Sequence, residues 1–271
     1  MELPDFLNRR QAERSWAFAN GFNNGDPATN GEFAWLDMLL DNAALLVDVG
    51  ANEGLFVERA ARRKPDLNIV AIEPNPAHGK RLAQLLEPVG GRLQPVALGD
   101  APGFAFLHVH ARHHATASLN GRPRMTHRFR EDISKIEVPV RRLDQVDLGV
   151  IPAGTLLLKI DAEGYEFPIL RGATEVLDRH ESVAVLFEFS YGWLESGESL
   201  INCFNFLDMR GFDFYRLLPI GLEHVRFFSN GMDQSQYCNY VALKNVPLDG
   251  DRVLDLATPL GSTRLHLFPG V

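Results

Sequence analysis

Three acidic side chains of this 271-residue sequence stand within or directly after short apolar runs. They are Asp48, Glu73 and Asp161. The runs have no helical period, which is typical of strands in a parallel sheet covered on both faces, and such sheets bind ligands beyond their carboxyl ends. An acid roughly 20 residues beyond a glycine turn binds a ribose diol in nucleotide-binding sheets, and Glu73 has that position. We therefore expect the three carboxyl groups to share one crevice. The predicted strands are 45–49, 69–72 and 155–160.

A glycine turn follows the first of these strands, in the segment DVGANEG that begins at Asp48. Gly50 and Gly54 allow backbone amides to approach a ligand, and the helix predicted over 53–63 directs the positive end of its dipole there. A dinucleotide site needs a glycine where this chain has Asn52, and Asp48 would repel a pyrophosphate. The turn therefore favours a ligand with an ammonium group, such as S-adenosylmethionine, over a dinucleotide.

Several segments resemble the FkbM-type family of S-adenosylmethionine-dependent methyltransferases. They are DVGANEG beginning at Asp48, AIEPNP ending at Pro76, and KIDAEGYE followed by a helix with LRGA. The resemblance extends over about residues 48–190. It implies an α/β, doubly wound (Rossmann-like) class I methyltransferase fold, with a mostly parallel sheet whose last strand is antiparallel. It also implies S-adenosyl-L-methionine as the cofactor.

The turn and the resemblance together indicate which residues bind the cofactor. The first two motifs supply most of them, and a segment similar to the one beside the adenine ring in the family adds two apolar contacts. These residues are Asp48, Gly50, Ala51, Asn52, Gly54, Glu73, Pro74, Asn75, Ala97 and Leu98. Ser118 and Leu119 resemble a Ser-Leu pair of the family, and their role does not follow from the sequence.

Asp161 and Glu163 are the candidate catalytic residues. Methyl transfer to oxygen is an in-line displacement, in which the acceptor must be aligned and its proton removed. We expect Asp161 to be the base or the acceptor-orienting group, with Glu163 as the next candidate. In the alternative, Asp161 contacts the methionine end of the cofactor, and Glu163 caps the helix or binds Lys159 or Arg171. His110 is a further candidate base. Two carboxylates alone are weak support for a divalent cation, so no metal is predicted.

A histidine- and arginine-rich segment interrupts the α/β pattern between residues 103 and 142. Strands at 103–109 and 136–142 are predicted to form a small antiparallel addition around it. The segment fits a solvated loop, a lid whose arginines close on an anionic acceptor, or a metal site that begins with His108 and His110. Its histidines, and its arginines between positions 108 and 130, are His108, His110, Arg112, His113, His114, Arg122, Arg124, His127, Arg128 and Arg130.

The rest of the sequence predicts one α/β domain with additions at both ends. The formal net charge of −8 argues against nucleic-acid binding. No apolar run reaches the ~20 residues of a membrane span, and the presence of only Cys203 and Cys238 favours reduced thiols in the cytoplasm. The predicted parts are a helical N-terminal cap over 1–43, a methyltransferase domain over 44–246 with the hairpin and basic loop inserted at 103–142, and a C-terminal extension over 247–271.

Three local expectations concern the surroundings of the crevice. The helices predicted at 6–18 and 32–40 are interpreted as a structural cap rather than as part of the site. His78 is expected to face solvent on its helix. Tyr191 and Trp193 fit either the wall of an acceptor pocket or packing in the core and at its rim, and packing is favoured.

The predicted function is O-methylation of a hydroxyl of a sugar or secondary metabolite, by a methyltransferase of class EC 2.1.1.-. The family resemblance supplies the acceptor class, so the expected partner is a small molecule or a glycan. The arginine-rich insertion suggests an anionic acceptor. The alternatives are an N-methyltransferase of the same fold, a catalytically silent nucleotide-binding scaffold, and a dehydrogenase, which Asp48 and Asn52 disfavour.

Overall fold

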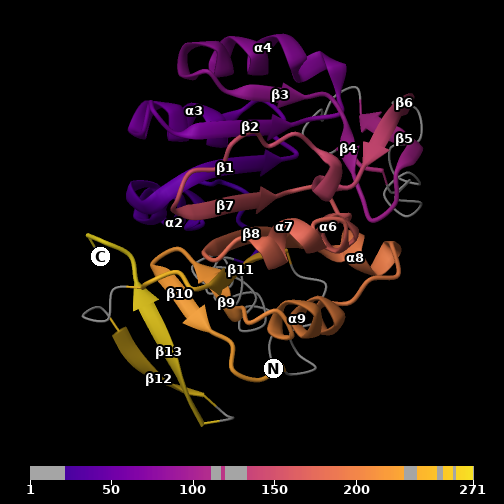
Figure 1. The fold of residues 1–271 in the computed structure, drawn as a ribbon. Helices are drawn as coiled ribbons and strands as arrows, with labels where there is room; N and C mark the ends of the chain where they lie inside the picture. Colours follow the sequence, from indigo (N-terminus) through magenta and orange to yellow (C-terminus); the bar gives the residue numbers. More distant parts are fainter. Residues whose placement is uncertain are drawn as a thin grey trace, which may run out of the picture.

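The fold is built on one large mixed β-sheet. The computed structural model describes residues 22–110, 117–119, 133–228, 237–248, 253–258 and 261–270. Among these residues the sheet has ten strands, in the order β12-β13-β10-β9-β11-β8-β7-β1-β2-β3 (Figure 1). The strands are β1 (Ala43–Val49), β2 (Asn68–Ile72), β3 (Arg92–Gln94), β7 (Thr155–Ile160), β8 (Val183–Phe189), β9 (Asp213–Leu218), β10 (Gly221–His224), β11 (Cys238–Lys244), β12 (Val253–Thr258) and β13 (Gly261–Leu267).

The strands β3, β2, β1, β7 and β8 form the parallel half of the sheet. Every residue of β1, β7 and β8 is buried, as the continuous apolar runs predicted. Successive side chains point to opposite faces, so Leu45 and Val47 belong to one core cluster and Leu46 to the other. β1 lies between β2 and β7 and is parallel to both, so the carboxyl ends of the three strands lie side by side. This is the arrangement expected if Asp48, Glu73 and Asp161 share one crevice.

Helices cover both faces of this half, and hydrophobic packing holds them there. The core cluster on one face takes side chains from α2, α3 and α4, and the cluster on the other face takes side chains from α6, α7, α8 and α9. The helices are α2 (Glu32–Leu39), α3 (Leu55–Arg63), α4 (Pro76–Leu86), α6 (Glu166–Arg171), α7 (Thr174–Arg179), α8 (Tyr191–Glu195) and α9 (Leu200–Asp208).

A small three-stranded sheet lies beyond the carboxyl ends of the parallel strands (Figure 1). The predicted hairpin forms as β5 (Gly103–His110) and β6 (Ile133–Arg141), which are antiparallel. Residues 92–98 form two short strands rather than one, because the chain leaves the large sheet after β3 and continues as β4 (Ala97–Leu98) beside β6. Pro95 lies at this break and has no N–H to donate to a strand ladder.

The antiparallel half of the sheet is larger than the single last strand that the family resemblance implied. β11 lies antiparallel between β8 and β9, and β10, β13 and β12 extend the sheet by further antiparallel pairs. Part of the predicted C-terminal extension therefore continues the same sheet. The division of the chain into 1–43, 44–246 and 247–271 stays a prediction.

The helix predicted at 6–18 and most of the histidine- and arginine-rich loop lie outside the described residues. Within the described part of the chain, no helix has both the length and the apolar character needed to cross a membrane. The cytoplasmic location stays a prediction.

Candidate functional site

The glycine turn after β1 brings the ends of three strands together. The Gly50 and Ala51 amides donate to the Ile72 carbonyl at 2.9 and 3.2 Å, which ties the turn to β2. Gly50 has a φ of 71°, and a Cβ at this position would lie 1.8 Å from the Asp161 carbonyl oxygen. Only glycine fits so close to the end of β7, and its absent side chain leaves the crevice open.

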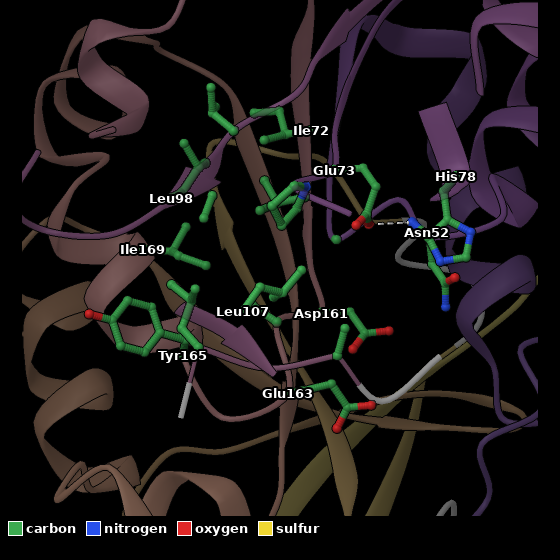
Figure 2. Close-up of a pocket in the computed structure, with 18 residues that line it drawn as sticks. Asn52, Ile72, Glu73, His78, Leu98, Leu107, Asp161, Glu163, Tyr165 and Ile169 are labelled. Atoms are coloured by element: carbon green, nitrogen blue, oxygen red, sulfur yellow. Dashed lines mark hydrogen bonds between the residues drawn. The ribbon is translucent and has the colours of Figure 1, made fainter. Parts of the chain in front are cut away.

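Glu73 lies at the end of β2 and is held rigidly. Its two carboxyl oxygens accept hydrogen bonds from the backbone N–H groups of Asn52 and Asn75, both at 2.8 Å. The side chain is 7% exposed, and burial raises its pKa although the two amides favour the charged form. The contact with Asn52 fixes the glycine turn against the acid that the sequence assigns to a ribose (Figure 2).

An apolar pocket lies between this turn and the small sheet. Figure 2 shows Leu98, Ile169 and Tyr165 at one side of it, and Glu73, Asn52 and Asp161 toward the other. An apolar slot next to a buried carboxylate suits an adenosine, with a flat ring and a polar ribose. The lining residues are Val49, Gly50, Asn52, Ile72, Glu73, Pro74, His78, Val96, Ala97, Leu98, Leu107, Ala117, Leu119, Asp161, Ala162, Glu163, Tyr165 and Ile169.

His78 lines this pocket, so the expectation that it faces solvent is wrong. The side chain is only 8% exposed. It lies in the first turn of α4, which starts beside Glu73, so the turn before the helix brings the imidazole to the pocket. The burial of His78 could not be predicted from its place on the helix, because it depends on the segments that pack against α4.

A larger cavity of about 440 Å³ adjoins the pocket on the other side of the turn. Gly50, Asn52, Asp161 and Glu163 belong to both hollows. Its wall carries six carboxyl groups and, among the described residues, one cation. The lining residues are Gly25, Pro27, Glu32, Asp48, Gly50, Ala51, Asn52, Glu53, Leu55, Phe56, Lys159, Asp161, Glu163, Glu188 and Tyr237.

Lys159 is the cation of this cavity, and it links two of the predicted site residues. Its Nζ lies 3.3 Å from Asp48 Oδ1 and 3.5 Å from Asp161 Oδ2, and it donates to the Gly50 carbonyl at 3.3 Å. Burial alone lowers the Lys159 pKa, but Asp48, Asp161 and Glu32 outweigh burial and raise it. Asp48 is completely buried, and burial raises its pKa. The sequence offered one signal for this role, a lysine in an otherwise apolar strand.

The turn between Asp161 and α6 has a strained backbone. Glu163 has a φ of 54° and Gly164 a φ of 100°. The buried Glu166 carboxylate accepts hydrogen bonds from the Ala162 amide at 2.9 Å and the Gly164 amide at 3.1 Å. Ser118 Oγ donates to the Glu163 carbonyl at 3.0 Å, which gives the Ser-Leu pair a structural role. Glu166 rather than Glu163 therefore holds the turn before the helix, and the Glu163 side chain is directed into the crevice (Figure 2).

Burial of two carboxyl groups predicts an unusual dependence of stability on pH. Burial raises the pKa of both Glu32 and Glu166 from 4.5 to about 7. Between these values the folded chain holds protons that the unfolded chain releases, so the free energy of unfolding falls as pH rises from about 4.5 to 7. We expect a lower melting temperature at about pH 8 than at about pH 5. Thermal unfolding followed by circular dichroism measures it.

Two substitutions make this expectation specific. Glu166→Gln removes one titrating group and should flatten the dependence, whereas the matched change at exposed Glu175 should leave it as in the wild type. A wild-type melting temperature that rises over this pH interval would contradict the assignment.

A third hollow lies beside α8 and shares Glu163, Glu188 and Tyr237 with the larger cavity. Tyr191 lines this hollow, as the pocket-wall interpretation allowed. Trp193 does not, because it is completely buried against Phe187 and Phe189 and donates from Nε1 to the Glu188 carbonyl at 3.0 Å. The other lining residues are Ser190, Gly192 and Glu195.

The structure brings most of the predicted cofactor residues to the two main hollows, with two exceptions. Gly54 packs against α4, where a Cβ would lie 2.6 Å from a Leu85 methyl group. Asn75 caps α4, with its side-chain oxygen accepting from the Ala77 amide at 3.1 Å. Both residues shape the turns rather than line the crevice.

The metal interpretation of the basic segment is not supported by the described residues, which hold no group of three or more histidine, cysteine or acidic side chains placed to bind a metal. His108 lies on β5, where its backbone pairs with Ser118. The side chain of His110 and the other histidines and arginines of the loop lie outside the described residues.

Comparison with known proteins adds an independent finding. The model of the methyltransferase FkbM domain matches residues 48–216. Methyltransferase 1 of Beauveria bassiana (strain ARSEF 2860) is 29% identical over 146 residues, which cover 48% of this chain. The aligned part spans 58% of that relative's length.

Two solved structures show similarity at low sequence identity. The precorrin-6y C5,15-methyltransferase of Geobacter metallireducens GS-15 is 12% identical, with 79% of this chain and 87% of that chain covered and a TM-score of 0.43. A TehB-like SAM-dependent methyltransferase from Corynebacterium glutamicum ATCC 13032 Kitasato is 13% identical, with 90% of this chain and 100% of that chain covered and a TM-score of 0.43.

The family match covers more than half of the sequence and contains every motif on which the resemblance rests. The chain belongs to the FkbM-type family of S-adenosylmethionine-dependent methyltransferases.

Proposed function

We propose that this protein transfers a methyl group from S-adenosylmethionine to a hydroxyl of a sugar or secondary metabolite. The observation that carries the proposal is the position of Glu163, which lines the apolar pocket, the larger cavity and the hollow beside α8. In this arrangement the apolar pocket holds the nucleoside and the larger cavity holds the acceptor. A carboxylate at their junction can reach an acceptor hydroxyl that points toward the nucleoside.

The residues around the glycine turn fit the cofactor. In this proposal Glu73 holds the ribose, Ala97 and Leu98 pack on the base, and Gly50 and Asn52 leave room for the part of the cofactor that passes the turn. When bound, S-adenosylmethionine supplies a methyl group on a cationic sulfur, which is released as the thioether of S-adenosylhomocysteine. The protein's task is then to hold the acceptor oxygen in line and to receive its proton.

Glu163 is our candidate for the base, and Asp161 for the group that orients the acceptor hydroxyl. The reason is the environment of Asp161, which lies 3.5 Å from the Lys159 ammonium. This ion pair holds the Asp161 carboxylate in one position, which suits an orienting role, whereas Glu163 lines all three hollows and can approach the acceptor. This assignment reverses the order of preference drawn from the sequence.

The described wall of the larger cavity bears on the charge of the acceptor. The arginines that suggested an anionic acceptor lie outside the described residues, and that suggestion stays a prediction. The carboxyl groups along the described wall of the cavity favour a neutral or positively charged acceptor, because they repel an anion.

N-methylation is the second candidate function, and the same carboxyl-rich wall favours it. A neutral amine can accept a methyl group without a strong base. For an amine acceptor, Asp161→Asn and Glu163→Gln should therefore cost little turnover, and mass spectrometry of the product would place the methyl group on nitrogen.

The first test is calorimetric titration of the purified protein with S-adenosylhomocysteine, with NADH as the control ligand. Micromolar binding of S-adenosylhomocysteine alone is the expected result. A screen of hydroxyl acceptors with a labelled methyl donor then follows. Binding of NADH alone would return the dehydrogenase alternative. Cofactor binding without turnover on any acceptor would favour the silent scaffold.

Glu73→Ala should weaken S-adenosylhomocysteine binding roughly tenfold to over a hundredfold. A hydrogen bond to a charged group is worth ~1.5–3 kcal/mol, and the Asn52 and Asn75 amides also lose their acceptor. Glu73→Gln keeps one acceptor oxygen and should lose less. Titration calorimetry measures both. Unchanged affinity for Glu73→Ala would remove this residue from the cofactor site.

A further inference from the structure

Glu32 is a buried carboxylate in the larger cavity that neither the motifs nor the family match accounts for. It begins α2 and precedes the matched residues 48–216. The side chain is 9% exposed, and it lines the cavity. The sequence interpretation of this helix as a purely structural cap is therefore incomplete.

The hydrogen bonds of Glu32 fix one of its oxygens and leave the other to a ligand. Oε1 accepts from Asn30 Nδ2 at 2.6 Å and from Asn239 Nδ2 at 2.8 Å. Oε2 accepts no hydrogen bond from the described residues. An unpaired charge at this depth is costly, so a donor or a cation at the second oxygen would stabilise the charged form of Glu32.

The groups that face Glu32 come from several elements around the cavity. Lys159 on β7 favours its charged form, while Asp161 at the end of β7 opposes it. Lys159 already lies between Asp48 and Asp161, so it is shared among three carboxyl groups. Tyr237 also lies near Glu32, and burial raises its pKa, so its phenol is neutral. The described wall therefore has an excess of negative charge.

We propose that Glu32 binds a protonated amino group of the acceptor. The substrate class is then an amino alcohol, such as an amino sugar, whose hydroxyl is methylated at Glu163 while its ammonium group is held at Glu32. This inference rests on the proposed function. Glu32, Asn239 and Tyr237 all lie outside residues 48–216, so the part of the chain beyond the family domain selects the acceptor.

A matched set of three probes tests the charge preference directly. The probes are trans-4-aminocyclohexanol, trans-cyclohexane-1,4-diol and trans-4-hydroxycyclohexanecarboxylate. Each has a sugar-sized ring with a hydroxyl at one position, and the group across the ring is a positive ammonium, a neutral second hydroxyl or a negative carboxylate. Binding is measured by ligand-observed NMR on the full chain saturated with S-adenosylhomocysteine. We expect the amine to bind at least tenfold more tightly than the diol, and the carboxylate to bind more weakly than either.

Glu32→Gln identifies the residue responsible. Its side-chain oxygen can still accept from Asn30 and Asn239, so the fold is kept while the charge is lost. We expect the tenfold preference for the amine to disappear and the affinity for S-adenosylhomocysteine to stay unchanged. The matched control is Glu87→Gln, an exposed glutamate between α4 and β3, which should keep the preference.

The pH profile provides a readout that needs no variant. The amine probe stays protonated, and Glu32 ionises near pH 7, so wild-type affinity for the amine should rise between about pH 6 and pH 8. Affinity for the diol should stay level over the same interval.

Four outcomes would overturn the inference. They are equal binding or no binding of the amine and the diol by the wild type, tighter binding of the carboxylate, a preference that survives in Glu32→Gln, and a tenfold loss of S-adenosylhomocysteine affinity in Glu32→Gln. The last result would assign Glu32 to the amino group of the cofactor. Failure of the wild type to bind S-adenosylhomocysteine at all would instead contradict the proposed function, so the two failures are distinguishable.

Discussion

Glu163→Gln is expected to lower kcat by ~10²–10⁴-fold on a hydroxyl acceptor while the affinity for S-adenosylhomocysteine stays near that of the wild type. The substitution keeps the size and hydrogen-bonding shape of the side chain but removes its ability to take a proton. The substitution adds no backbone strain at the φ of 54°, because Gln and Glu have the same side-chain shape. Steady-state kinetics with a labelled methyl donor measure the change.

The comparison with Asp161→Asn separates the two candidate roles. Asp161 lies beside Lys159 and orients the acceptor in our assignment, so Asp161→Asn should raise KM more than it lowers kcat. Glu87→Gln is the control for a lost surface carboxylate. An undiminished kcat in Glu163→Gln, together with a large loss in Asp161→Asn, would move the role of base to Asp161.

Gly50→Ala should abolish cofactor binding and destabilise the protein. The new Cβ would lie 1.8 Å from the Asp161 carbonyl oxygen, which is backbone and has no side-chain freedom to move away. The residue would also have to adopt a φ of 71°, which costs a non-glycine residue ~1–2 kcal/mol. We expect the free energy of unfolding to fall by at least ~2 kcal/mol, with no titratable binding of S-adenosylhomocysteine.

Gly79→Ala is the matched control for this substitution. Gly79 lies within α4, and apart from its chain neighbours and the helix's own backbone no atom lies within 4 Å of the position that a Cβ would take. Alanine is favoured over glycine in a helix by roughly 0.5–1 kcal/mol, so this variant should be slightly stabilised and should bind the cofactor as before. Urea unfolding and calorimetry measure both properties. Normal binding of S-adenosylhomocysteine by Gly50→Ala would show that the backbone at the end of β7 can move away from the new Cβ. It would contradict the claim that only glycine fits at position 50.

The parallel half of the fold was predictable because its signals are local. Strands buried on both faces must be apolar throughout, so β1, β2 and β7 can be read as short apolar runs. The glycine turn is equally local, since position 50 has a φ of 71°, a conformation that glycine adopts at no steric cost. From these features follow the crevice at the strand ends and the position of Glu73 and Asp161 beside it.

Other expectations failed where packing between distant segments decides the outcome. His78 has sequence surroundings that fit the surface, yet it lies in the pocket. The packing favoured for Trp193 is confirmed, but its sequence surroundings fitted a pocket wall equally well. Glu166 rather than Glu163 accepts the hydrogen bonds from the turn before α6, because its carboxyl group is the one buried under the turn. Nothing within a few residues of these positions distinguishes the alternatives.

The sequence by itself determined the family, the parallel core and the identity of the acidic residues at the crevice, because each depends on neighbouring residues and a repeating backbone geometry. Only the tertiary structure placed Lys159 between Asp48 and Asp161, and only it brought Glu32 from α2 and Asn239 from β11 to one carboxyl group. Those contacts join residues as much as 207 positions apart, and burial at such contacts sets the charge of the cavity.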